Sequence, residues 1–443
     1  MSFTNLRPTT VHYPESDVQN MLDLLRRAPF PDAPPVQPRE AGSMGIDHAY
    51  LRALKHRFEH DWSWSALEER INKFPHFLVD VNTDDGDEFT MHFVHQRSSR
   101  PDAIPLLMLH GWPDSFYTFH KIIEPLTNPP SPDLPAFHVI APSLPGYFMS
   151  TLPKRDGFNL ADVARVLNAF MTRCLGYDMY AVQAGDWGAM IARIMSNQYP
   201  SSVVSAHFNF LLVLPPSTGS PDPSTFGETE RQILANNDWF IQHESAYWSM
   251  QATKPFTIGF AIGASPLALL AYIGDKMRRW SDPARISDAD VVDNVALYFL
   301  SGSFASSVCM YNQAFKTRGN DGSSQLDSLT LPIHTRAFGY SAFPYEAGGG
   351  PRAYMEPLGN LTFYKEHTGG GHFPALDSPS ELVDDVREFF GENYERFVRA
   401  AVGVRRRRTL DSAGKTAKVG KGKAMEPAGE REKLPFYGWF AVA

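Results

Sequence analysis

Ala181-Val-Gln-Ala-Gly-Asp-Trp-Gly-Ala-Met190 is the stretch that decides the fold. An apolar run from Met179 to Val182 predicts a strand, and the amphipathic segment from Ala189 to Tyr199 predicts a helix. The turn between them carries a single acid, Asp186, with a small residue two positions before it and another two positions after it. This spacing is typical of a nucleophile elbow, a strained turn that presents a reactive side chain at its tip.

The residue at the tip of this turn limits the chemistry. Serine is the usual residue there, but this chain has Asp186. A carboxylate is a poor nucleophile for acyl transfer, although it can displace a leaving group at a saturated carbon and form an ester. Asp186 therefore points to alkyl transfer and away from esterases. Aspartate is also a common helix N-cap, and the turn alone does not decide between the two roles.

Strands and helices are expected to alternate on both sides of the elbow. Strands are predicted at 77–82, 89–95, 104–109, 137–141, 203–210, 333–338, 361–365 and 369–373. Helices are predicted at 115–126 and 160–175, and a last one from Ser378 to about Ala401. Such alternation is typical of an α/β sheet that is mostly parallel.

The same pattern divides the chain into segments. Residues 1–85 are expected to form an N-terminal extension that clamps the main domain. The α/β core would occupy 86–213 and 321–401, interrupted at 214–320 by an aromatic, helical cap. Residues 402–443 form a basic tail of low complexity, for which we favour a solvated, disordered extension over a nuclear address or a tether to an anionic surface.

Composition narrows the class of protein. The tail from Ala400 has ten Lys/Arg and four Asp/Glu, so it carries +6 and leaves −14 on the rest of a chain of net charge −8. An acidic body without a basic stripe argues against nucleic acid as a partner. Cys174 and Cys309 are the only cysteines and lie far apart in the sequence, which argues against a disulfide framework or a zinc site. Because the sequence has no signal-peptide pattern, we expect a cytoplasmic protein. The apolar run 257–274 contains Pro266 and three glycines, so we expect a buried helix pair rather than a membrane span.

Two residues late in the chain are candidates to assist Asp186. His372 follows a Gly-rich approach and precedes the last predicted helix, so its imidazole could lean over the carboxyl edge of the sheet. Glu346, just after the strand near Phe338, could hold the tautomer of that histidine and stabilise its cation. Other carboxylates compete with Glu346 for this role: Asp327, Glu356 and Glu366.

The stretch His110-Gly-Trp-Pro113 follows a buried strand and suggests an oxyanion hole. Its turn can aim the Trp112 backbone N–H at the reacting carboxyl, and the Trp187 N–H directly after the nucleophile supplies a second donor. For His110 we favour a structural role in the turn. The Trp112–Pro113 bond is a candidate cis peptide.

An alkoxide leaving group needs a proton donor opposite the nucleophile. Tyr247 and Tyr311 in the aromatic cap could donate a proton while their rings line an apolar pocket. The chain has seventeen tyrosines, so position alone does not select these two.

Taken together, these motifs resemble the epoxide hydrolases of the microsomal type, which have an α/β-hydrolase fold with a helical cap and an N-terminal domain. The resemblance covers roughly Ser16 to Ala401. Its motifs are HGWP at 110–113, GDWG at 185–188, FPYE at 343–346, GGHF at 370–373 and ALEERINKFPHF at 66–77. The resemblance also selects the tyrosines, because Tyr247 in YWSMQATKP and Tyr311 in MYNQAFK match the two cap tyrosines of the family.

The sequence departs from the family at two places near the site. Asp114 follows HGWP where the family commonly has Gly, which adds a charge near the oxyanion turn. Phe148-Met-Ser150 stands where Gly-Phe-Ser is usual. Both departures are expected to narrow or reshape the pocket.

The resemblance implies a reaction without cofactor or metal. Asp186 would attack an epoxide carbon while Tyr247 and Tyr311 bond the ring oxygen, and His372, oriented by Glu346, would activate the water that hydrolyses the ester to a vicinal diol. The implied substrate is a small apolar or aromatic epoxide. The N-terminal segment could support a homodimer. Two alternatives remain open at this point, a haloalkane dehalogenase and a non-catalytic small-molecule binder on the same fold.

Overall fold

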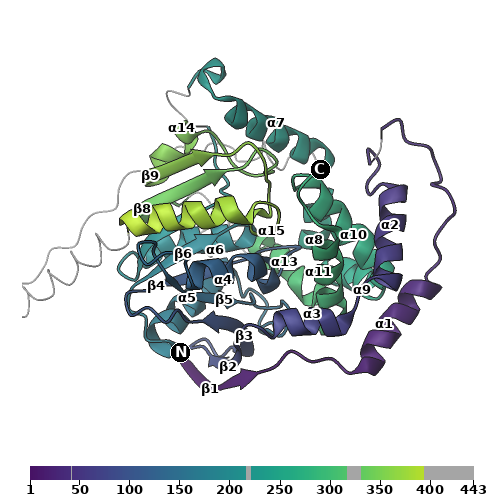
Figure 1. Cartoon of the computed structure of the whole chain (residues 1–443), viewed down its shortest axis with the longest axis horizontal. Helices are drawn as coiled ribbons and strands as arrows, with labels where there is room; N and C mark the ends of the chain where they lie inside the picture. Colours follow the sequence, from purple (N-terminus) through teal and green to yellow (C-terminus); the bar gives the residue numbers. More distant parts are fainter. Residues whose placement is uncertain (41, 216–220, 317–330, 394–443) are drawn as a thin grey trace, which may run out of the picture.

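One nine-stranded sheet runs through the part of the chain that the structure describes (Figure 1). The computed structural model describes residues 1–40, 42–215, 221–316 and 331–393. The strands lie in the order β1-β2-β3-β5-β4-β6-β7-β8-β9. Their bounds are β1 Ser2–Thr9, β2 His76–Asn82, β3 Glu88–Gln96, β4 Ile104–Leu109, β5 Phe137–Pro142, β6 Tyr180–Ala184, β7 Val203–Phe208, β8 Ile333–Ala342 and β9 Gly359–Glu366.

The six strands from β5 to β9 in the sheet order run parallel to one another, and β5 pairs antiparallel with β3 on its other side. The predicted α/β fold with a mostly parallel sheet is confirmed. Every residue of β4, β6 and β7 is buried, as near-continuous apolar strands of a parallel sheet must be. The helices that connect these strands are α4 Ile123–Thr127, α5 Leu160–Ala169 and α6 Asp186–Gln198. A last helix at 379–393 starts directly after Ser378, as the sequence predicts.

The N-terminal extension contributes two strands to the sheet, β1 and β2, and β2 is the strand that the sequence predicts at 77–82. β1 pairs antiparallel with β2, and β2 pairs with β3 along its whole length. The predicted boundary at residue 85 therefore falls in the turn of a hairpin. β1 escapes prediction because nearly all of its residues are exposed, and an exposed edge strand has no apolar alternation.

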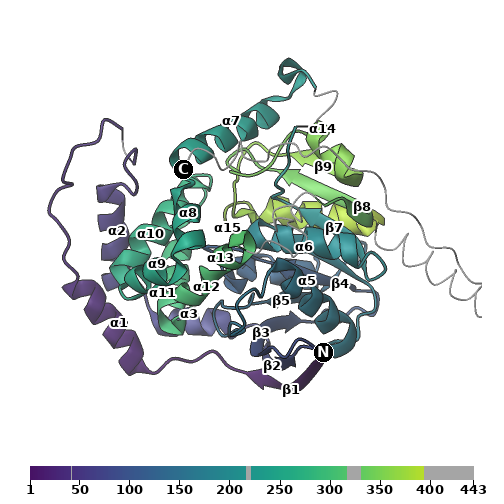
Figure 2. The same cartoon turned by 180° about the vertical axis from the view of Figure 1, so that it is seen from behind.

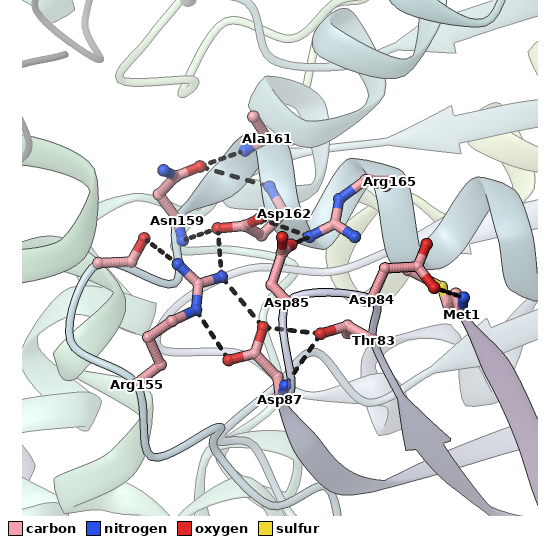
Figure 3. A network of polar contacts seen from close by, with 11 residues as sticks. Met1, Thr83, Asp84, Asp85, Asp87, Arg155, Asn159, Ala161, Asp162 and Arg165 are labelled. Atoms are coloured by element: carbon pink, nitrogen blue, oxygen red, sulfur yellow. Dashed lines mark hydrogen bonds and ion pairs between the residues drawn. The ribbon is translucent and has the colours of Figure 1, made fainter. Parts of the chain in front are cut away.

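The turn of this hairpin is fixed to the loop before α5 by a network of ion pairs (Figure 3). Arg155 bonds both carboxylate oxygens of Asp87, at 2.8 and 3.0 Å, and also reaches Asp162 at 3.1 Å. The amino group of Met1 pairs with Asp84 in the same turn. The start of the chain and the β2–β3 hairpin are thus joined to the core through charged groups.

Between β7 and β8 the chain forms the predicted helical cap, which lies beside the sheet in both views (Figures 1 and 2). The cap helices are α7 Glu228–His243, α8 Ala246–Thr253, α9 Pro255–Gly263, α10 Pro266–Arg279, α11 Asp288–Ser301, α12 Phe304–Ser307 and α13 Cys309–Lys316. The N-terminal helices α1 Glu15–Arg27 and α2 His48–His60 pack on α10 and α11. The extension therefore wraps the cap as well as adding to the core.

The third N-terminal helix, α3 Trp64–Ile71, carries a polar contact between the extension and the cap. Arg70 on α3 donates to Asp293 of α11 at 2.6 Å. The indole N–H of Trp62, just before α3, donates to the other oxygen of Asp293 at 3.0 Å. Asp293 thus receives two bonds from the extension.

Two local expectations are wrong. The run 257–274 does form two helices, α9 and α10, with a 113° bend between them, but Phe256 and Phe260 of α9 are exposed rather than buried. No single helix among the described residues is long and apolar enough to cross a membrane. The expected strand at 369–373 is an irregular turn with one bridge, from Gly371 to Tyr345, because the chain there bends around His372. The tail 402–443 lies outside the described residues.

Candidate active site

The elbow has the geometry that its spacing predicts. β6 ends at Ala184, α6 begins at Asp186, and Asp186 has a positive φ of 46°. A side chain at Gly188 would overlap the Leu109 carbonyl, so only glycine lets α6 come this close to β4. Gly185 is the N-cap and α6 has no side-chain cap, so the capping interpretation of Asp186 is wrong.

The carboxylate of Asp186 lies between the turn at Trp112 and the imidazole of His372. Its Oδ1 accepts a 2.7 Å hydrogen bond from the Trp112 backbone N–H, and the Trp112–Pro113 bond is cis. Its Oδ2 lies 3.2 Å from His372 Nε2. The structure therefore brings together the nucleophile candidate, one oxyanion donor and the candidate base.

His372 is held on its other side by Glu346. The two meet at 2.6 Å through His372 Nδ1 and Glu346 Oε1, which also accepts from the backbone N–H groups of Ala347 and Gly348. Glu346 is fully buried, and burial raises its pKa while His372 opposes that rise. Burial disfavours the imidazolium as well, but Glu346 and Asp186 outweigh it and raise the pKa of His372 to about 10.

Of the three carboxylates that competed with Glu346, the two in the described part of the chain do not bond to His372, whose ring pairs with Glu346 and Asp186. Glu356 is exposed and pairs with Arg352, and Glu366 is exposed on β9. Asp327 lies outside the described residues.

His110 has the structural role that we favoured for it. It is buried, its Nδ1 lies 3.0 Å from the Gly111 carbonyl, and its Nε2 accepts from the Leu144 N–H at 3.1 Å. Both ring nitrogens are therefore engaged in holding the turn that presents Trp112.

An aromatic cavity lies over Asp186 and contains both candidate proton donors. Tyr247 on α8 stacks on Trp112, with ring centres 5.2 Å apart, and Tyr311 on α13 packs edge-on against Trp187 at 4.7 Å. Burial raises the pKa of both phenols well above the usual value, so each keeps its proton at neutral pH. The other aromatic residues in its wall are Phe210, Phe240, Trp248, Trp280 and Phe315.

Sequence reasoning missed two tryptophans of this cavity. The Trp280 carbonyl, at the end of α10, accepts a 2.7 Å bond from the backbone N–H of His372 and so ties the loop of the base to the cap. The indole N–H of Trp248 donates to the Tyr247 hydroxyl. The side-chain donor of Trp248 was visible in the sequence as a neighbour of Tyr247, whereas a backbone acceptor such as Trp280 O leaves no signal in residue types.

The two departures from the family pattern have different places in the structure. Asp114 is buried near Asp186, and burial raises its pKa to about 7 against hydrogen bonds from Thr118 and Ser115. Phe148 is buried against the rings of His92 and Phe116 and lines neither cavity that Asp186 borders, so the expectation that it reshapes the pocket is wrong. Among the described residues, no group of three or more His, Cys, Asp or Glu side chains could hold a metal ion.

Fold and site together define an α/β-hydrolase with an acid at its elbow. Comparison with known proteins agrees, because the sequence model for the alpha/beta hydrolase fold matches residues 104–246 and the one described as epoxide hydrolase N terminus matches residues 6–119. The chain is 30% identical to epoxide hydrolase 1 of Sus scrofa over 417 residues, which cover 87% of this chain and 89% of that protein.

Solved structures give the same result. The Aspergillus niger epoxide hydrolase is 31% identical with a TM-score of 0.77, covering 88% of this chain and 97% of that one. The juvenile hormone epoxide hydrolase of Bombyx mori is 28% identical with a TM-score of 0.78, covering 88% and 95%. The chain belongs to the epoxide hydrolase family. It is a hydrolase that opens epoxides with water. Membership of this family favours epoxide hydrolysis over the two alternatives, a haloalkane dehalogenase and a non-catalytic binder.

Proposed function

We propose that the chain hydrolyses small apolar or aromatic epoxides through a covalent ester on Asp186. The observation that carries this proposal is the position of the Asp186 carboxylate, 2.7 Å from the Trp112 N–H and 3.2 Å from His372 Nε2, at the floor of a cavity that also contains Tyr247 and Tyr311. A nucleophile, its base and a proton donor for the leaving group then share one space.

Ring opening is the first step of the proposal. One Asp186 oxygen attacks an epoxide carbon, the carbon–oxygen bond of the ring breaks, and the hydroxyls of Tyr247 and Tyr311 donate to the oxygen as it gains charge. Because both phenols are buried and protonated, they can act as acids towards an alkoxide, which is a stronger base than a phenolate.

Ester formation then prepares His372 for its role as a base. In the free enzyme the carboxylates of Asp186 and Glu346 both stabilise the imidazolium, whose pKa is about 10. When Asp186 becomes an ester it loses its charge, so the pKa of His372 falls and the neutral imidazole becomes accessible. His372 can then take a proton from water, while Glu346 stabilises the cation that forms.

Hydrolysis of the ester needs stabilisation of a tetrahedral oxyanion. The Trp112 N–H already bonds Asp186 Oδ1, and we propose the Trp187 N–H as the second donor. The attacking water adds to the Asp186 carboxyl carbon, the bond to the alkyl oxygen breaks, and the diol leaves with its proton. The oxygen of the water remains in Asp186.

The substrate class follows from the wall of the cavity. Rings of tryptophan, tyrosine and phenylalanine supply most of its surface. A wall of this kind favours apolar or aromatic substituents on the epoxide.

A cytoplasmic location and a homodimer complete the proposal. Free thiols at Cys174 and Cys309 support a reducing compartment. Cell fractionation and size-exclusion chromatography with light scattering test the two points separately.

Trapping of the ester tests the mechanism. In His372→Gln, ring opening is expected to proceed while hydrolysis is slow, so intact-mass spectrometry after mixing with styrene oxide should show one epoxide mass added to the protein. In the double variant Asp186→Asn/His372→Gln the added mass should be absent. A variant His372→Gln that turns over without any adduct would contradict the covalent route.

A further inference from the structure

Two cavities meet at Asp186 and His372. One is the aromatic cavity described above. The other is a small polar cavity of about 30 Å³, and Asp186 and His372 are the residues that line both. Apolar residues such as Leu109, Phe119 and Leu382 form part of its wall, and its remaining polar side chains are His110, Asp114, Thr118, Gln183 and Asn209. Nucleophile and base therefore separate an apolar space from a polar one.

The polar cavity has the size and the chemistry of a water site. A volume of about 30 Å³ is enough for a water molecule, and buried waters bond polar groups that the protein leaves without partners. Gln183 is such a group. Its Nε2 donates to Asn209 at 3.0 Å, whereas its buried Oε1 has no hydrogen-bond partner among the described residues.

Asp114 brings a carboxyl group to the same cavity. The Ser115 N–H at 2.8 Å and the Thr118 hydroxyl donate to it. A carboxylate accepts about four hydrogen bonds, so acceptor capacity remains. The backbone on either side is fixed, because Tyr298 donates to the Asp114 carbonyl at 2.8 Å and Asn294 donates to the Pro113 carbonyl at 2.6 Å.

We propose that this polar cavity holds the water that hydrolyses the ester, and that Asp114 and Gln183 are positioning residues for that water. The inference rests on the proposed ester mechanism. The water donates one O–H to Asp114 or Gln183 and the other to His372 Nε2, which leaves a lone pair for the Asp186 carboxyl carbon. As the new C–O bond forms, His372 takes the proton, and it returns a proton to the departing alkyl oxygen. Asp114 exchanges no proton in this sequence.

This arrangement separates the paths of the two reactants. The epoxide occupies the aromatic cavity, and the water approaches from the polar one. The alkyl group of the ester therefore does not block the path of the water to the Asp186 carboxyl carbon. The Asp114 that departs from the family pattern is then assigned to the second half-reaction and not to the shape of the substrate cavity.

The two half-reactions can be measured separately with styrene oxide. Ring opening is expected to change the fluorescence of Trp187, Trp248 and Trp280, because these residues line the aromatic cavity. Quenched-flow mass spectrometry follows the ester. In Asp114→Leu we expect ring opening within about threefold of the native rate and ester hydrolysis slower by about 10- to 100-fold, the effect of one lost hydrogen bond to a charged group. The ester should therefore accumulate.

Two further variants keep the test decisive if Asp114→Leu does not fold. Asp114→Asn keeps one acceptor oxygen and should slow hydrolysis less than the leucine variant. Gln183→Met removes the unpartnered oxygen at similar size and should also slow hydrolysis selectively. Asp293→Asn is the matched control, because it changes another buried aspartate that lines neither cavity, and both of its rates should remain native.

Two results would overturn the inference. Unchanged hydrolysis in both Asp114 variants would exclude a role in water positioning. An equal loss in both half-reactions would mean that Asp114 acts only by shaping the turn that holds Trp112. Failure of the ester mechanism itself has a different signature, because no adduct would then appear even in His372→Gln.

Discussion

The Nε2 atom of His372 lies 3.2 Å from Oδ2 of Asp186, so base and nucleophile form an ion pair before any substrate binds. With Glu346 at 2.6 Å on the other ring nitrogen, His372 has a carboxylate on each side. Glu346 and Asp186 together keep the base protonated in the free enzyme. The part that Asp186 contributes is lost when its carboxylate loses its charge.

Neutralising Asp186 should therefore lower the pKa of His372. Asp186→Asn mimics the loss of charge on ester formation, and NMR titration of the imidazole should give a value well below the native one of about 10. The folded-state pKa of native His372 exceeds the unfolded value near 6.5, so its contribution to stability is complete below pH 6.5 and disappears as pH rises towards 10. In denaturant unfolding, the free energy of unfolding of Asp186→Asn should fall less between pH 6.5 and pH 10 than that of the native protein. An unchanged histidine pKa would contradict the coupling.

The two cap tyrosines should control ring opening. Tyr247→Phe and Tyr311→Phe are each expected to slow formation of the ester by about 10²-fold or more, and the double variant should lose it, because no acid remains for the alkoxide. Hydrolysis of ester that has already formed should change little. Stopped-flow fluorescence with styrene oxide measures the first step. If the double variant still opens the epoxide, the assignment of the acid is wrong.

Buried histidines should make the fold sensitive to acid. His92 is completely buried between His76 and Ser143, with 2.9 Å to each, and burial holds its pKa well below 6.5. The unfolded chain binds this proton near pH 6.5, so the contribution of neutral His92 to stability is present above that pH and is lost as pH falls below it. In His92→Gln the free energy of unfolding should fall less between pH 7 and pH 5 than in the native protein. An equal fall in the free energy of unfolding of both proteins would show that His92 does not contribute to the acid sensitivity of the fold.

Local sequence patterns predict much of this structure because they report local geometry. The elbow at Asp186 was visible from the small residues around it, and buried strands such as Ile104–Leu109 were visible from their apolar runs. His372 was found because its Gly-rich approach is unusual in this chain. These features depend on neighbours in sequence.

What the sequence could not supply depends on contacts between distant residues. Glu346 was one of four candidate carboxylates until the fold placed it 2.6 Å from His372. Tyr247 and Tyr311 were selected by resemblance, since burial on two separate cap helices has no local signal. The exposed α9 was expected to be buried because composition does not tell which apolar helix finds a partner. The carbonyl of Trp280 acts through the backbone, which every residue has.

A single turnover in heavy-oxygen water tests the ester on Asp186 most directly. With enzyme in excess over epoxide, the ester mechanism places the oxygen of water in the carboxylate of Asp186, where mass spectrometry of the peptide that contains this residue detects it. The diol from the first turnover should carry no label. Label in that diol, with none in Asp186, would mean that water attacks the epoxide directly and would contradict the account.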